Sequence, residues 1–126
     1  MPKADLQLGP IGQISLTVKD IDRSTAFYRD TLGIQFLFRA PNLAFFDCAG
    51  VRLMLGLPEG SGERHNSVLY FKLDEIERAH ETLLARGVVF EGKPHVVAKM
   101  PDHELWMAFF RDPDKNLLAL MSEVKL

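Results

Sequence analysis

The chain has 126 residues, of which 47% are hydrophobic and 25% charged, and its formal net charge is −2 at pH 7. This length fits one domain whose core is large enough to be stable without disulfides or a structural metal ion. Basic and acidic residues are mixed along the chain, so the sequence offers no basic stripe and argues against a nucleic-acid partner. Cys48, the single cysteine, cannot form an internal disulfide. With neither a bilayer-spanning apolar run nor a signal-peptide core, no membrane association and a cytoplasmic location are expected.

One pattern occurs twice along the chain. Residues 14–36 read ISLTVKDIDRSTAFYRDTLGIQF, and residues 68–90 read VLYFKLDEIERAHETLLARGVVF. Each copy begins with a β-rich run, continues as an amphipathic helix and reaches Gly33 or Gly87, which suits the left-handed position after a helix. The copies continue with LAFFDCAGVRLML, residues 43–55, and MAFFRDPDKNLLAL, residues 107–120, which share Ala-Phe-Phe. The sequence therefore predicts two units, each made of a strand, a helix and three strands.

The repeat divides one domain, residues 1–126, into a first βαβββ module at 11–57, a linker at 58–66 and a second module at 67–123. The linker has the Gly, Ser and charge content of an exposed loop. In the second module, the polar turn at 111–116 between apolar runs predicts a β-hairpin over residues 109–123. Asp74 and Glu77 have the spacing of a capping box before the second helix.

The predicted strands have two different faces. In residues 13–18 the even-numbered positions are apolar and are expected to meet the helix, whereas Gln13, Ser15 and Thr17 are expected to line the opposite face. Two such modules placed side by side predict an α+β fold, in which a curved mixed sheet surrounds a trough.

Two segments carry a family resemblance: QISLTVKDIDRSTAFYRDTLGI, residues 13–34, and FFRDPDKNLLAL, residues 109–120. They resemble the vicinal oxygen chelate superfamily, which includes glyoxalase I, bleomycin-resistance proteins and extradiol dioxygenases. The resemblance implies a glyoxalase-like fold and a small-molecule ligand in the trough. It also implies a homodimer, with modules paired either within or between chains. The fold alone does not define an activity, since it serves many.

Enzymes of this superfamily typically hold a metal ion at four trough positions, which the resemblance carries over to Gln13, Met54, Val68 and Ala119. Only Gln13 offers a donor atom that suits a divalent ion. A shift of one residue along the last strand of each module reaches only leucines, at positions 53, 55, 118 and 120. Ala119 stands where metal-dependent relatives usually carry a glutamate, so no metal cofactor is expected.

The second module carries additional residues within EGKPHVVAKMPDHELW, residues 91–106, before its Ala-Phe-Phe. The expected ligand-binding residues share the trough-facing parity of their strands or, for Trp106, belong to this insertion. They are Gln13, Ser15, Arg52, Met54, Val68, Tyr70, Lys72, Trp106 and Ala119. Cys48 and His80 are interpreted as structural, and no catalytic residue is assigned.

Three functions remain open from the sequence. The leading hypothesis is a metal-free protein that binds a small organic molecule, in the manner of the bleomycin-resistance type. The alternative is a metal-dependent lyase, isomerase or dioxygenase of glyoxalase type, with a divalent ion held by Gln13, His65, His103 and Glu104. A partner-binding module is the third, although the sequence offers no motif for it.

Overall fold

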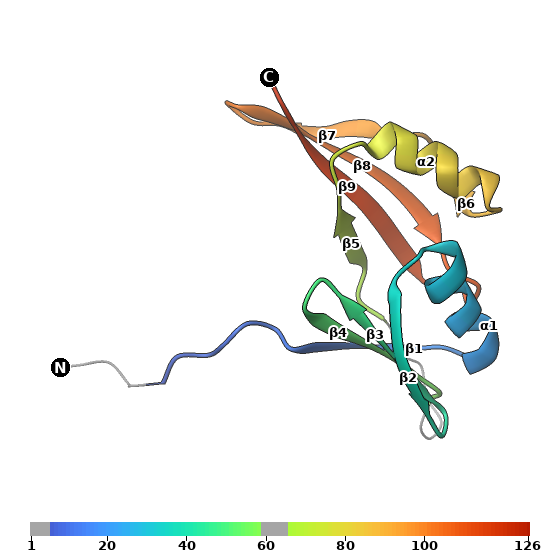
Figure 1. Cartoon of the computed structure of the whole chain (residues 1–126). Helices are drawn as coiled ribbons and strands as arrows, with labels where there is room; N and C mark the ends of the chain where they lie inside the picture. Colours follow the sequence, from blue (N-terminus) through green and yellow to red (C-terminus); the bar gives the residue numbers. More distant parts are fainter. Residues whose placement is uncertain (1–5, 59–65) are drawn as a thin grey trace.

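A computed structural model describes residues 6–58 and 66–126 and confirms the α+β fold with two open sheets (Figure 1). Most of the expected linker, residues 59–65, lies outside the described residues, as does His65. The first module consists of β1 (Gln13–Thr17), α1 (Ile21–Ala26), the π-helical turn η1 (Phe27–Thr31), β2 (Gln35–Ala40), β3 (Leu43–Cys48) and β4 (Val51–Gly56). The second consists of β5 (Leu69–Lys72), α2 (Ile76–Ala85), β6 (Val89–Phe90), β7 (His95–Lys99), β8 (His103–Arg111) and β9 (Leu117–Lys125).

The two sheets repeat one topology. The first sheet has the order β1-β4-β3-β2, and the second has the order β5-β9-β8-β6, with β7 also paired to β8. In both sheets the first strand runs parallel to the last, and the other pairs are antiparallel. The second helix is followed by four strands and not the expected three, because β6 and β7 together occupy the edge that β2 occupies in the first sheet. The inserted residues thus form β7 and lengthen β8.

The ends of the helices are set by local chemistry. Gly33 and Gly87 have φ angles of 78° and 88°, which confirms their expected left-handed conformation. Asp20 caps α1 by accepting a hydrogen bond from the Arg23 amide at 3.0 Å. The expected capping box of α2 is wrong, because the N-cap residue is Glu75 and its side chain makes no capping hydrogen bond. Within the described residues, no helix is long and apolar enough to cross a membrane.

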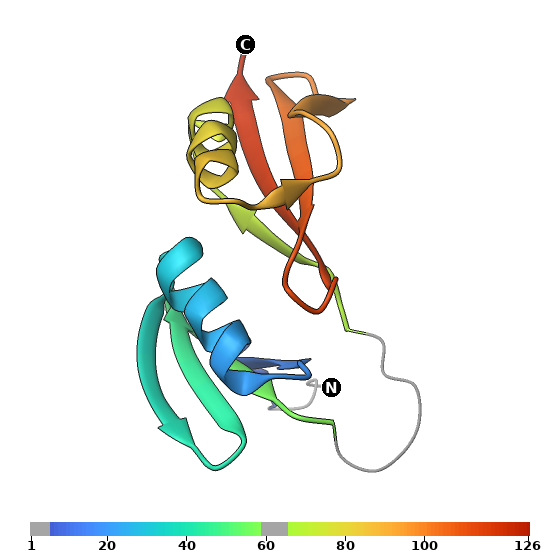
Figure 2. The ribbon, with the colours of Figure 1, turned by 90° about the vertical axis from the view of Figure 1, so that its right-hand side faces the viewer.

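The helix-facing residues of both sheets form one continuous core. Leu16, Phe46, Phe110 and Leu118 are fully buried and belong to a single cluster that extends through both modules. His80 packs edge-on against Phe90 at the boundary of this core, with ring centroids 4.4 Å apart, as the helical pattern indicated. Figures 1 and 2 show α1 and α2 on the same side of the molecule, so the opposite faces of the sheets point away from the helices.

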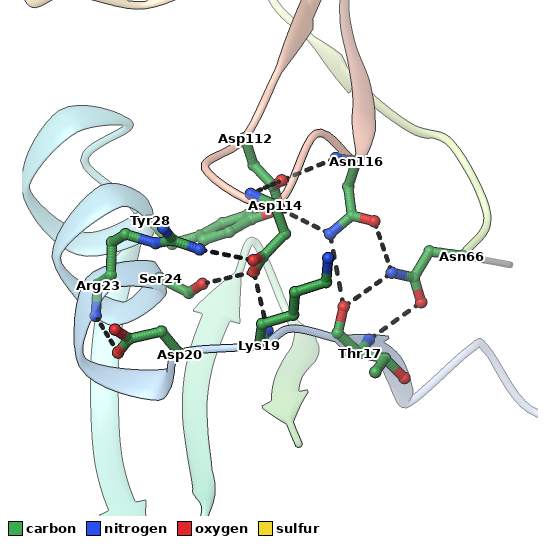
Figure 3. A network of polar contacts seen from close by, with 10 residues as sticks. All are labelled: Thr17, Lys19, Asp20, Arg23, Ser24, Tyr28, Asn66, Asp112, Asp114 and Asn116. Atoms are coloured by element: carbon green, nitrogen blue, oxygen red, sulfur yellow. Dashed lines mark hydrogen bonds and ion pairs between the residues drawn. The ribbon is translucent and has the colours of Figure 1, made fainter. Parts of the chain in front are cut away.

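The turn between β8 and β9 joins the two modules through buried polar groups (Figure 3). Asp112 is 4% exposed. Its carboxylate accepts hydrogen bonds from the Tyr28 hydroxyl and the Asn116 side chain, both at 2.8 Å, and from the backbone amides of Asp114 and Asn116. Burial raises the pKa of Tyr28 far above its ordinary value, and the charge of Asp112 and its hydrogen bond add to the effect.

We define the polar clasp as Asp112, Asp114, Asn116, Asn66 and the groups that they contact. Asp114 and Asn66 add further hydrogen bonds to those of Asp112. Asp114 accepts hydrogen bonds from the Arg23 guanidinium at 2.7 Å, the Lys19 amide at 3.0 Å and the Ser24 hydroxyl at 3.2 Å. The Asn66 side chain pairs with the backbone of Thr17 and donates to Asn116 at 2.7 Å.

We predict that Tyr28→Phe lowers the free energy of unfolding by about 1–3 kcal/mol, because a hydrogen bond to a buried carboxylate is lost. The measurement is equilibrium unfolding in urea. Tyr70→Phe is the matched control, since Tyr70 is 47% exposed, and it should stay within about 0.5 kcal/mol of the parent. If the two substitutions lower the free energy of unfolding equally, the buried Tyr28 hydroxyl stabilises the fold no more than an exposed hydroxyl does.

Candidate functional site

The face of the first sheet that points away from α1 carries the predicted site residues of that module. Gln13 pairs in register with Arg52, and Ser15 pairs with Met54, on the adjacent strands β1 and β4. The Gln13 amide nitrogen lies 3.9 Å from the Met54 sulfur. Gln13, Ser15 and Arg52 are exposed, and Met54 is half-buried. This face is therefore open to solvent within the single chain.

Aromatic rings extend the same face toward the sheet edge. The rings of Phe38 and Phe45 stack with centroids 4.5 Å apart and an interplanar angle of 23°. The Arg52 guanidinium carbon lies 5.9 Å from the Phe45 ring centroid. Phe46, the next residue on β3, is fully buried on the helix side. Phe45 and Phe46 thus lie on opposite faces of the sheet.

The second sheet carries an equivalent face. Tyr70 on β5, Ala119 on β9 and Phe109 on β8 are neighbours across three strands. The Tyr70 and Phe109 rings meet edge to face, with centroids 6.1 Å apart. Lys72 lies on the same face and forms an ion pair with Glu123 at 3.3 Å. This face therefore combines an aromatic wall with a charge pair that is internally balanced.

Three of the four positions to which the family resemblance assigns metal ligands lie on these two faces, Gln13 and Met54 on the first sheet and Ala119 on the second. The fourth, Val68, directly precedes β5. Met54, Val68 and Ala119 have no donor atom suited to a hard or borderline metal ion. Across residues 6–58 and 66–126, no three His, Cys, Asp or Glu side chains are grouped so that they could hold a metal ion.

The alternative ligand set is divided between different parts of the fold. Gln13 belongs to the first sheet, whereas His103 and Glu104 begin β8 of the second. His103 Nδ1 lies 2.8 Å from the Asp102 carboxylate, and this contact lowers the pKa of Asp102. Glu104 accepts a hydrogen bond from the Trp106 indole at 3.2 Å. As neighbours on one strand, His103 and Glu104 point to opposite faces of the sheet.

The placement of Trp106 corrects the sequence-based site. Trp106 lies on the helix side of β8, where it lines a cavity with Ile76 and Glu77 of α2. It alternates with Met107 and shares its face with the buried Ala108 and Phe110. Counting back by two from Phe110 assigns Trp106 to this face once residues 103–111 are known to form one strand. Trp106 is therefore not part of the trough face of this chain.

Phe38 is the trough residue that the sequence analysis missed. A bulge between Phe36 and Phe38 shifts the pairing of β2 with β3. Phe36 consequently contacts the core residue Phe46, while Phe38 stacks on Phe45 on the other face. Two residues that strict alternation would place on one face are thus separated by the irregularity. No pattern in the sequence signals this bulge.

A cavity lies where the edge of the first module meets β5. It is lined by Ile14, Cys48, Val51, Leu53 and residues 68–71. It includes Val68 and Tyr70, two of the expected ligand-binding residues. Burial raises the pKa of the Cys48 thiol, with a smaller contribution from the Asp47 charge, so the environment disfavours the thiolate that a nucleophile needs.

Comparison with known proteins identifies the family. The model of the Glyoxalase/Bleomycin resistance protein/Dioxygenase superfamily matches residues 10–120. The protein YraH of Bacillus subtilis (strain 168) is 32% identical, with 86% of this chain and 94% of YraH covered. The chain therefore belongs to the Glyoxalase/Bleomycin resistance protein/Dioxygenase superfamily, as the two sequence motifs indicated.

Solved structures agree with this assignment at the level of the fold. A member of the superfamily from Sphaerobacter thermophilus is 27% identical and has a TM-score of 0.74, with 94% of this chain and 100% of that chain covered. Lactoylglutathione lyase from Agrobacterium tumefaciens is 24% identical with a TM-score of 0.74, and 91% of this chain and 94% of that chain are covered. These similarities extend over nearly the whole chain and establish the glyoxalase-like architecture.

Proposed function

We propose that the chain binds a small organic molecule on the trough faces of its two sheets, without a metal ion at the four positions that relatives use. The observation that carries the proposal is the chemistry of those positions. Gln13 supplies one amide, and Met54, Val68 and Ala119 supply none of the nitrogen or oxygen donors that a catalytic divalent ion needs. The surrounding aromatic and polar side chains are those of a ligand pocket.

A second copy of the chain is proposed to complete the pocket. Within one chain the modules meet on their helix sides, where the polar clasp and the shared core join them. The trough faces are left open, with Tyr70 and Phe38 both 47% exposed. Because one open face buries little of a ligand, pairing the first module of one copy with the second module of another supplies the missing wall.

A metal-dependent lyase, isomerase or dioxygenase is less well supported. Its described ligands would have to come from two modules, and His103 and Glu104 point to opposite faces of β8. The polar contacts of these two residues are also local, with Asp102 and Trp106.

We predict that Zn²⁺, Ni²⁺, Mn²⁺ or Fe²⁺ in excess leaves the thermal unfolding midpoint where it is in EDTA. A specifically bound ion at one hundred times its dissociation constant would stabilise the fold by about 2.7 kcal/mol, which a thermal scan resolves readily. His103→Ala and Glu104→Gln serve as controls for the alternative ligand set. A rise in midpoint with metal that either substitution removes would contradict the proposal and favour the metal enzyme.

We predict a homodimer at micromolar concentration, measured by light scattering or sedimentation. The expected mass is twice the chain mass of 14.2 kDa. Such an interface should bury on the order of 1,000 Å² or more in total to persist in dilute solution. A species that keeps the mass of one chain throughout this range would rule out a stable dimer.

A further inference from the structure

We infer that the ligand of the proposed trough is a planar aromatic molecule with a negative charge, held by the first module on Phe38, Phe45, Arg52 and Gln13. This inference rests on the proposed function and specifies the chemical class of its ligand. The four residues form a row across the first sheet, one from each of the strands β2, β3, β4 and β1. We call this set the aromatic row.

The aromatic part of the row is a flat platform. Phe45 is 9% exposed, whereas Phe38 is 47% exposed, and their rings are nearly parallel. The stacking contact holds the Phe38 ring in place on an edge strand, where an isolated phenylalanine would be free to turn. An exposed ring that is already oriented favours stacking by another planar ring, because little side-chain freedom is lost on binding.

The charge of the row comes from Arg52. Its cross-strand partner is Asp47, but no ion pair joins these two described residues, and the guanidinium lies over the Phe45 ring. The Asp47 carboxylate instead accepts a hydrogen bond from the Gly50 amide at 3.3 Å, in the turn between β3 and β4. A planar guanidinium beside an aromatic platform matches a carboxylate attached to an aromatic ring, since its fork can donate two parallel hydrogen bonds.

The neighbouring groups favour the same ligand. Gln13 is the register partner of Arg52 on β1, and its amide can donate to a carboxylate oxygen beside the guanidinium. On the second sheet, the charge of Lys72 is already paired with that of Glu123. The Tyr70 and Phe109 rings there can form the opposite aromatic wall when a second copy pairs with the row.

The test uses 2-naphthoate as the probe, with 2-naphthalenemethanol and 2-naphthylmethylamine as its neutral and cationic counterparts. Isothermal titration calorimetry with the full chain should give the tightest binding for 2-naphthoate. Arg52→Gln should weaken that binding roughly tenfold or more, because a charge-assisted hydrogen bond is lost. Phe38→Ala should also weaken it. Arg78→Gln is the matched control, since Arg78 is an exposed arginine on α2 and lies outside the row, and it should leave the affinity unchanged.

Several results would overturn the inference. One is the absence of 2-naphthoate binding, and another is equal affinity of the parent and Arg52→Gln. The alcohol or the amine could bind as tightly as 2-naphthoate, with Phe38→Ala abolishing that binding. This result would rule out the need for a negative charge on the ligand, while the trough would still be a small-molecule site. If Phe38→Ala instead dissociates the dimer without a change in affinity per chain, the row is a subunit contact. Stabilisation of the parent chain by metal would instead contradict the proposed function, and that measurement does not depend on these three probes.

Discussion

The arrangement of the two modules depends on the hydrogen bonds of the buried Asp112 carboxylate. This carboxylate lies at the tip of the β8–β9 hairpin and binds the Tyr28 hydroxyl of the first module, in a region almost closed to solvent. A buried charge without partners is costly, so the turn must remain where Tyr28 and Asn116 can reach it. Asp114 adds a second attachment at the start of α1. The sheets are thereby joined on their helix sides, and their other faces are left available to a ligand or a second copy.

Because side chains alternate along the strands, each sheet has one face that packs into the core and a second face in the trough. On β9, Leu118 and Leu120 enter the core, while Ala119 between them belongs to the trough face. A position with this alternation can lose a metal ligand without damage to the packing behind it, because the two faces are independent. Residues of the trough face can therefore differ between proteins of this fold while the core-facing residues keep their packing.

The sequence predicted the fold because the repeat, the helix-ending glycines and the hairpin turn are local signals that tertiary contacts reinforce. It did not predict the division of one edge into β6 and β7, which depends on pairing with β8. It did not reveal that Trp106 lies on the helix side, because the register of β8 is set by its pairing with β7 and β9, and it did not reveal Phe38, because a bulge reverses the alternation. The clasp joins Tyr28 to a residue 84 positions away. No local pattern contains such a contact.

The central claim is that the trough has the architecture of a metal site but lacks its ligands. The most direct measurement is the metal content of the purified protein after exposure to Zn²⁺, Ni²⁺, Mn²⁺ and Fe²⁺ and removal of unbound ions, determined by elemental mass spectrometry. The account predicts a content well below one ion per chain for every metal, since Gln13 alone cannot hold a divalent ion against water. Retention of one ion per chain would contradict it.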